Sequence, residues 1–255
     1  SDGQMLFLSH LAHKMRPAHE GGGRAGIVLN GSPLFNGAAE SGPSEIRRWL
    51  LEGDLVDAIV ALPANMFFNT GISTYIWILD NTKTPERKGK VQLIDATSFW
   101  TRLRKNLGAK GREVGAADRE RILKLYDDYV ENKHSKIVDT AAFGYWTITI
   151  ERPLLDEQGH VVTDSKGRPK SDAKLRDTEN VPFSYEEGIE AYFKAEVLPH
   201  VPDAWIDAKR TKVGYEIPFT RQFFQYVPPR PVGEIDADLE AQVAKILNLL
   251  REVEA

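Results

Sequence analysis

The clearest chemical signal in the sequence is a concentration of basic residues near the middle of the chain. Seven cationic side chains fall between Ser98 and Arg121, and Trp100 stands at the start of this segment. Basic charge beside an aromatic ring suits contact with a phosphate backbone, so the segment predicts salt-sensitive DNA binding. The alternative is a solvated helical face with a flexible loop at residues 108–115. The residues concerned are Arg102, Arg104, Lys105, Lys110 and Arg112, followed by Arg119 and Arg121.

A second candidate group combines two aromatic residues with an Asn-Thr-Gly turn. It lies between Met66 and Gly71 and contains Phe67, Phe68, Asn69 and Thr70. Exposed aromatic side chains are unusual in a plain connection between strands. The alternative is that the two phenylalanines fold back into the core, where large apolar side chains are usually found.

Other patterns offer little chemistry. His10 and His13 have helical spacing, but no third ligand accompanies them, so we expect solvated histidines and no metal site. Gly21, Gly23 and Gly26 match the glycine spacing of a dinucleotide-binding loop, yet they precede a strand instead of following one. There is no cysteine, and no Ser-His-Asp arrangement or paired-carboxylate motif, so no catalytic residue is assigned.

Two apolar runs must position the aromatic segment. Residues 56–62 and 74–79 both have the pattern of strands in a buried sheet. The connection between them, residues 63–73, is too short for a crossover helix, so the two strands should pair as an antiparallel hairpin. The aromatic segment then lies in the loop at one end of the sheet.

A further strand and helix precede this hairpin. Residues 24–30 form another apolar run, and a helix should begin near Ser44 and stop at Gly53. Strand, helix and strand make one βαβ crossover, which the hairpin strand closes. Ligands of open α/β sheets bind beyond the carboxyl ends of the parallel strands, here near residues 30–35 and 63–69.

The rest of the chain contains shorter elements and one polar stretch. Residues 153–181 are charged and rich in turns, which predicts a two-stranded excursion or a loop. Residues 219–226 are aromatic and are expected to be extended. We further predict a strand at 90–96, a helix at 116–131, a strand at 145–151 and a helix at 186–197.

The carboxyl-terminal segment predicts a helix with an apolar seam. It follows a proline-rich spacer and carries Leu239, Val243, Ile246 and Leu250 at alternating spacings of four and three. Two heptads are too short to be stable alone, so the helix should pack on its own domain or on a partner subunit.

Composition indicates a globular protein without a strong global charge. The 255 residues are 42% hydrophobic and 27% charged, and the formal net charge is −4. We expect a soluble, cytoplasmic protein that has no membrane segment. Because the chain begins at Ser1 without a methionine, directly in a helix-like segment, we also expect a trimmed start.

Several of these segments together resemble the modification (methyltransferase) subunit of type I restriction-modification systems. The most specific one is Ala-Leu-Pro-Ala-Asn-Met-Phe-Phe-Asn-Thr-Gly-Ile-Ser-Thr at residues 61–74. Ser-Glu-Ile-Arg-Arg-Trp-Leu at 44–50 and Arg-Asp-Thr-Glu-Asn-Val-Pro at 176–182 add to it. The similarity continues through residues 197–205 and 214–221, so it covers nearly the whole chain.

The resemblance implies methyl transfer from S-adenosylmethionine to N6 of adenine in DNA. It also implies a Rossmann-like, mainly parallel α/β sheet whose antiparallel last strand is inserted beside the others, with a helical carboxyl-terminal tail. Enzymes of this kind hold an extrahelical base between apolar or aromatic side chains. The target-base contacts would be Phe67, Phe68, Asn69 and Thr70. The implied partners are double-stranded DNA, a specificity subunit and a restriction endonuclease subunit, with the specificity subunit docking on the helix at Leu239, Val243, Ile246 and Leu250.

The sequence departs from this family in one respect. It lacks the catalytic Asn-Pro-Pro-Phe or Asn-Pro-Pro-Tyr motif and the glycine-rich cofactor loop, so it resembles the carboxyl-terminal part of such a subunit and should be inactive alone. We expect residues 1–152 to be the second half of the catalytic domain, 153–184 a charged loop or excursion, and 185–255 a helical docking tail. The alternative is a non-enzymatic assembly module that binds DNA or another subunit.

Overall fold

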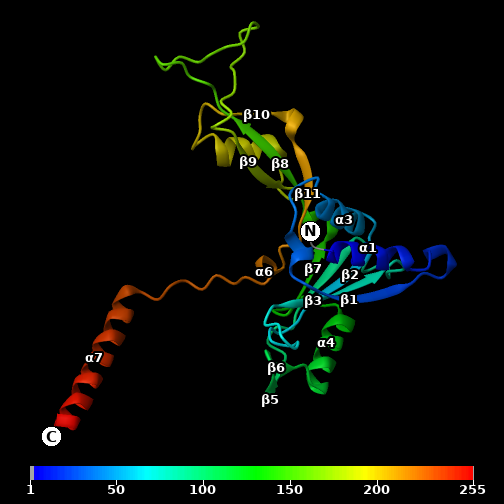
Figure 1. Ribbon diagram of the computed structural model, residues 1–255, viewed down its shortest axis with the longest axis vertical. Helices are drawn as coiled ribbons and strands as arrows, with labels where there is room; N and C mark the ends of the chain where they lie inside the picture. Colours follow the sequence, from blue (N-terminus) through cyan, green and yellow to red (C-terminus); the bar gives the residue numbers. More distant parts are fainter. Residues whose placement is uncertain (1–2, 255) are drawn as a thin grey trace. The chain divides into compact units, whose positions relative to one another are not determined.

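Five strands form the central sheet of the computed structural model, which describes residues 3–254 (Figure 1). The order across the sheet is β1, β3, β2, β4, β7. By their contacts, residues Ser1–Phe223 form one unit and Phe224–Ala255 a second. The strands span Arg24–Asn30 (β1), Thr74–Asp80 (β3), Val56–Ala61 (β2), Lys90–Asp95 (β4) and Ser135–Asp139 (β7).

The predicted antiparallel hairpin is confirmed. β2 and β3 run antiparallel, with Ile59 opposite Trp77, and β3 also pairs antiparallel with β1. β1 and β2 therefore point the same way and are separated by β3, while β4 lies parallel to β2 on its other side. Both of the loops expected near ligands, after β1 and after β2, lie at the edge of the sheet where β3 begins.

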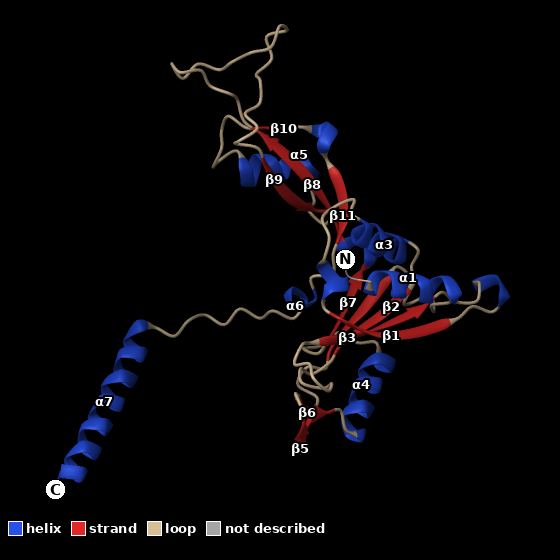
Figure 2. Cartoon of the chain, in the orientation of Figure 1, coloured by secondary structure: helices blue, strands red, loops and turns tan. Residues whose placement is uncertain are grey.

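Helices cover both faces of this sheet (Figure 2). Alternate residues of β3 face opposite ways, because side chains alternate along a strand. Trp77 packs in a core with α1 (Gln4–Lys14), α2 (Ser32–Phe35) and α3 (Gly42–Glu52), whereas Ile76 packs with α4 (Ala116–Asp128) on the other face. A 3-10 turn (Ala18–Glu20) precedes β1, and another (Thr140–Phe143) follows β7.

A second sheet is built around the long strand β8 (Gly144–Glu151). β9 (Asp177–Pro182), β10 (Trp205–Ile206) and β11 (Lys212–Tyr215) all pair antiparallel with it. α5 (Gly188–Tyr192) and the π-helical turn that follows (Phe193–Val197) cover its apolar face, and a 3-10 turn (Ala208–Arg210) leads into β11. The prediction of a helical tail from residue 185 omits β10 and β11, whose short runs carry too few apolar residues to be recognised.

Two segments of the second half, residues 153–181 and 219–226, were expected to be irregular or extended. Residues 153–176 leave and rejoin the second sheet with only isolated bridges, such as Leu155 opposite Val161, in keeping with the expected excursion or loop. The expectation extended to residue 181, but Asp177–Pro182 form the regular strand β9. The expectation of an extended segment at 219–226 is wrong at its start, where α6 (Phe219–Gln222) is a short helix. Phe219 is buried there and its ring lies 5.3 Å from that of Tyr75, so tertiary packing overrides the aromatic pattern.

A buried arginine fastens the second sheet to α3. Arg47 Nε donates a hydrogen bond to the carbonyl of Tyr215 (2.6 Å), and Nη1 donates to the carbonyl of Pro33 (3.1 Å). The Ser44 hydroxyl accepts a hydrogen bond from the backbone N–H of Tyr215 (3.0 Å) and so connects α3 to β11. The N-cap of α3 is Ser41, because the helix begins at Gly42. Burial lowers the pKa of Arg47 to about 10.

A polar network under α4 fixes that helix to the sheet. Arg87 lies between the rings of Tyr126 and Tyr129 and pairs with Asp57 at 3.4 Å. Its Nη2 donates to the carbonyl of Tyr126, while Gln92 donates to the carbonyl of Leu125 (2.8 Å). These bonds satisfy carbonyls that would otherwise lack partners near the helix end. Burial and the hydrogen bond to Asp57 raise the pKa of Tyr126 to about 12.

The second unit contains a single described helix. α7 spans Val232–Glu254 after a segment, residues 224–231, without regular secondary structure. Arg230 pairs with Asp238 at 2.7 Å across the start of the helix. Among the helices that the structure describes, none combines the length and the apolar character needed to cross a membrane.

Candidate nucleic-acid interface

The basic segment folds as a β hairpin instead of a helical face. β5 (Thr101–Leu107) pairs antiparallel with β6 (Lys110–Glu113), and Gly108 lies in the turn between them with φ at +60°. For residues 101–113 the helical alternative is therefore wrong, whereas Arg119 and Arg121 do lie on a helix, α4 (Ala116–Asp128). A left-handed backbone suits glycine, which explains why the chain reverses at this residue.

The hairpin is joined to the loop that follows β2. The backbone N–H groups of Gly111 and Arg112 both donate to the carbonyl oxygen of Asn65, at 3.1 and 3.3 Å. Gly108 lies against the same loop, since a Cβ atom placed on it would stand 3.0 Å from Phe68 Cε2 and 3.1 Å from Asn69 Oδ1. The two groups singled out in the sequence are thus neighbours in space, although about 40 residues separate them.

The aromatic residues of the loop are not core residues. Phe67 is 39% exposed and Phe68 is 65% exposed, so the alternative that they fold back into the core is wrong. Asn69 adopts a left-handed conformation with φ at +58°, and Phe67 and Thr70 form an isolated antiparallel bridge across it. The chain therefore turns tightly at Asn69 and presents the ring of Phe68 at the surface.

Among the described residues, the cations of the hairpin have no acidic partners. Within residues 3–254, none of the five side chains that are predicted to contact the DNA backbone forms an ion pair or a side-chain hydrogen bond. Arg102 stands directly opposite Arg112 in the hairpin register, an arrangement of like charges that disfavours pairing. These residues are Arg102, Arg104, Lys105, Lys110 and Arg112, of which the first three are exposed.

A polar hollow of about 470 Å³ lies between the hairpin and the loop. The guanidinium of Arg112 stacks over the ring of Trp100 at 4.0 Å, which places one cation at its wall. Asn65 and Asn106 contribute amide groups to the lining, and Arg102 adds a second cation. A planar group or a phosphate oxygen would meet donors, acceptors and positive charge there.

The remaining basic residues of this region, Arg119 and Arg121, lie on α4 and contact the segments next to it. Arg119 donates to the carbonyl of Val114 (3.0 Å), and Arg121 lies over the ring of Phe99 at 4.0 Å. An apolar hollow of about 330 Å³ lies beside them, where Met66 from the loop meets Ile122 and Leu123 from the helix. The sequence analysis did not predict this hollow. The signal available in the sequence was Leu123, an apolar residue that does not share the apolar face of its helix. In the structure it is 59% exposed.

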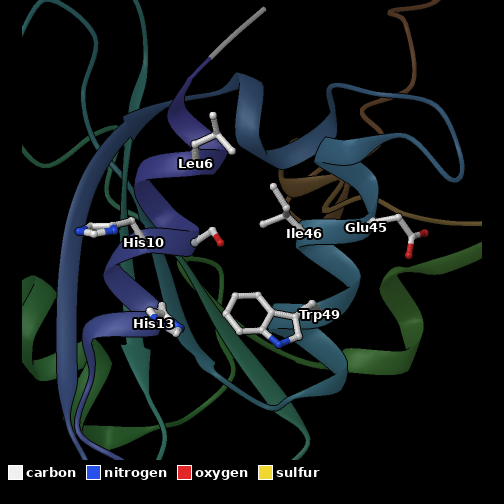
Figure 3. A pocket seen from close by; sticks show the side chains of 7 residues that line it. Leu6, His10, His13, Glu45, Ile46 and Trp49 are labelled. Carbon is white, nitrogen blue, oxygen red and sulfur yellow. The ribbon is translucent and has the colours of Figure 1, made fainter.

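The histidine pair lies elsewhere, on the other face of the sheet. His10 and His13 are exposed on α1, as predicted, and border an open groove of about 580 Å³ between α1 and α3 (Figure 3). Ile46 and Trp49 form the opposite wall. Trp49 is 45% exposed, so it belongs to the groove more than to the core.

The seam residues of α7 are all exposed. Each side chain is between 54% and 58% accessible, and together they form an apolar stripe along one side of the helix. Their role in docking stays a prediction. They are Leu239, Val243, Ile246 and Leu250.

The glycine run before β1 packs closely against neighbouring segments. A Cβ atom on Gly22 would stand 2.1 Å from Thr82 Cγ2, and one on Gly23 would stand 3.1 Å from the backbone nitrogen of Arg16. These glycines allow close packing between the end of α1 and the end of β3. Within the described residues, Gly22 and Gly23 therefore have a structural role in this packing.

Comparison with known proteins places the chain in a family. The family model of N-6 DNA methylase matches residues 1–144. The type I restriction enzyme MjaVIII methylase subunit of Methanocaldococcus jannaschii is 32% identical over 117 residues, which are 46% of this chain and 19% of that protein. The HindI methylase subunit of Haemophilus influenzae is 31% identical over 134 residues, 52% of this chain and 24% of that protein.

A solved structure has a similar sequence. The type I restriction-modification methyltransferase subunit from Streptococcus thermophilus is 29% identical, with a TM-score of 0.48, over 56% of this chain and 28% of that one. The aligned region spans about a fifth of each of the two curated relatives above. Because the family model matches more than half of its residues, the chain belongs to the N-6 DNA methylase family, and its relatives are methylase subunits of type I restriction enzymes.

Proposed function

We propose that this chain is the DNA-contacting part of a type I modification methylase, which transfers a methyl group from S-adenosylmethionine to N6 of adenine in DNA. The observation that carries the proposal is the contact between the loop of Phe68 and a hairpin of unpaired cations. An aromatic side chain that is free to stack and cations that are free to bind phosphate are the two components a base-extruding enzyme needs. In this proposal Phe67, Phe68, Asn69 and Thr70 contact the target adenine.

The roles follow from the positions of the residues. Arg102, Arg104, Lys105, Lys110 and Arg112 bind the DNA backbone beside the extruded base. Binding of phosphate between Arg102 and Arg112 also relieves the repulsion of two cations that face each other across the hairpin. No chemical step is assigned to the described residues.

The test measures DNA affinity at several salt concentrations. In the double variant Arg102→Gln and Arg104→Gln, the slope of log K against log salt should fall in magnitude by about 1.8, because each lost phosphate contact removes about 0.9. The matched control is Arg48→Gln with Arg210→Gln, since both of those cations already pair with carboxylates. An equal loss of slope in both double variants would remove the hairpin from the DNA interface.

We further propose that α7 docks on a specificity subunit, within a cytoplasmic complex that also includes a restriction endonuclease subunit. The stripe on α7 leaves four apolar side chains in water, and a helical partner would cover them. In this proposal the Rossmann-like part of the fold is the second half of the methylase sheet, and the domain limits lie near residues 152 and 184.

If α7 docks through its apolar stripe, placing negative charge on the stripe should prevent binding of the specificity subunit. Leu239→Glu together with Leu250→Glu should abolish capture of the specificity subunit in a pull-down, because two carboxylates would be buried at the interface. Ala237→Glu with Ala241→Glu adds the same charge on the opposite side of the helix and should leave capture intact. Unchanged capture by the leucine variant would refute the docking proposal.

A non-enzymatic assembly module is the alternative, and the same exposed stripe on α7 is compatible with it. Translating the coding DNA upstream of the Ser1 codon distinguishes the two. An open frame with Asn-Pro-Pro-Phe after a strand supports the methylase, whereas a nearby stop codon supports a module that only binds.

A further inference from the structure

The turn of the β5–β6 hairpin holds the loop of Phe68 through backbone atoms and one glycine. Two N–H groups of β6 converge on the carbonyl oxygen of Asn65, at the base of the loop. At the tip, Gly108 faces the ring of Phe68 and the amide of Asn69. The loop therefore contacts the hairpin at two points, and we call these two contacts the clamp.

The contact at Gly108 leaves little room for a side chain. The nearest atoms to its missing Cβ are Phe68 Cε2 at 3.0 Å, Asn69 Oδ1 at 3.1 Å and Phe68 Cδ2 at 3.3 Å. These distances are shorter than an ordinary contact between non-bonded carbon atoms, which is about 3.5–4.0 Å. A methyl group at this position must displace Phe68, Asn69 or the turn itself. A side chain at residue 108 would thus require the aromatic ring, Asn69 or the turn to shift.

The same hairpin carries the cations that lack acidic partners. Arg102 and Arg112 extend from the strands that Gly108 connects, and Arg112 follows directly on Gly111, whose N–H holds Asn65. An anion bound by these side chains would therefore be linked, through the short path from the hairpin to the loop, to the residues that position the Phe68 ring. The same hairpin thus carries the cations proposed to bind the DNA backbone and contacts the loop proposed to contact the base.

We propose that the β5–β6 hairpin sets the position of the base-contacting loop, and that Gly108 is a positioning residue for methyl transfer. This proposal rests on the proposed function and adds an element that acts on Phe68 and Asn69 without touching the base. When the hairpin binds the phosphates of the target strand, it places the ring of Phe68 where the extruded base arrives.

The first experiment uses the chain itself and is independent of any activity. Hydrogen exchange in Gly108→Ala should be accelerated on the order of tenfold at the amides of Gly111 and Arg112 and along residues 65–70, because the clamp opens locally. Gly167→Ala is the matched control. That glycine also has a positive φ, +75°, but nothing lies within 4 Å of its Cβ position. Unchanged exchange at residues 65–70 in Gly108→Ala would overturn the clamp.

The second experiment uses the full-length methylase with its specificity subunit. Gly108→Ala should lower kcat on the order of 10- to 100-fold with little change in the KM for DNA, since the cations remain while the ring is displaced. Gly108→Asn repeats the test with a residue that tolerates positive φ, so it separates displacement of the loop from backbone strain. Wild-type kcat in both variants would overturn the positioning role.

The outcomes of the two proposals are distinguishable. If Phe68→Ala lowers methyl transfer and Gly108→Ala does not, the positioning role fails and the base contact stands. If exchange accelerates in Gly108→Ala while neither variant changes methyl transfer, the clamp exists but the proposed base contact fails, and the positioning role fails with it.

Discussion

Replacing Phe68 with alanine in the full-length methylase is expected to lower kcat/KM for DNA methylation by about 10- to 100-fold. Stacking of a base on an aromatic side chain contributes about 1–3 kcal/mol, and each 1.4 kcal/mol is a factor of ten. The side chain is 65% exposed in this chain, so truncating it removes little from the core. The loss should therefore appear in catalysis and not in stability.

The control for this experiment is Phe7→Ala. Phe7 is 68% exposed on α1, which packs on the opposite face of the sheet from α4, so the variant loses the same side chain at a similar exposure. Binding of S-adenosylmethionine, measured by calorimetry, should be unchanged in Phe68→Ala. Methyl transfer equal to that of Phe7→Ala would discard the base-contact assignment.

Replacing Asp57 with alanine is expected to lower the free energy of unfolding by about 3–5 kcal/mol, the usual cost of leaving a buried charge unpaired. The Asp57 side chain is 2% exposed and that of its partner Arg87 is 11% exposed. Removal of the carboxylate leaves the guanidinium desolvated between two tyrosine rings. It also takes away the acceptor of the Tyr126 hydroxyl, so α4 loses part of its anchor.

Urea unfolding measures this effect through the midpoint of the transition. Asp128→Ala is the matched control, because Asp128 pairs with Lys124 at the surface and such pairs contribute less than about 1 kcal/mol. Replacing both partners with apolar residues, Asp57→Leu with Arg87→Met, should recover much of the loss. A midpoint in Asp57→Ala that matches Asp128→Ala would show that the pair does not stabilise the fold.

Local patterns in the sequence predicted the core of the fold. The apolar runs on either side of residues 63–73 paired as expected, because the short connection permitted only a hairpin. The position of β3 between β1 and β2 was not visible to local reasoning and came only with the family resemblance. Asp57 illustrates the limit, since it is a charged residue inside an apolar strand whose partner, Arg87, is 30 positions away.

The candidate site was predicted as two separate parts. The aromatic loop and the basic segment were each recognisable from residue type, but their contact depends on a turn at Gly108 that composition does not reveal. The helical alternative failed for residues 101–113, whose cations lie on two strands with Arg102 opposite Arg112, while Arg119 and Arg121 lie on α4. The strands of the second sheet were only partly foreseen, because β10 and β11 are short and gain their stability from pairing with β8.

The insertion of β3 between two strands that precede it has a consequence for synthesis on the ribosome. β1 ends at Asn30 and its antiparallel neighbour β3 ends at Asp80, so 50 residues must be translated after β1 before the β1–β3 pairing is complete. At about 5–20 residues per second this interval lasts several seconds, during which the edge of β1 that β3 later occupies is unpaired. The β2–β3 hairpin, once emerged, closes in about 1–10 microseconds. The yield of folded protein should therefore depend on translation speed and chaperone supply between codons 30 and 80 more than anywhere else in the sheet.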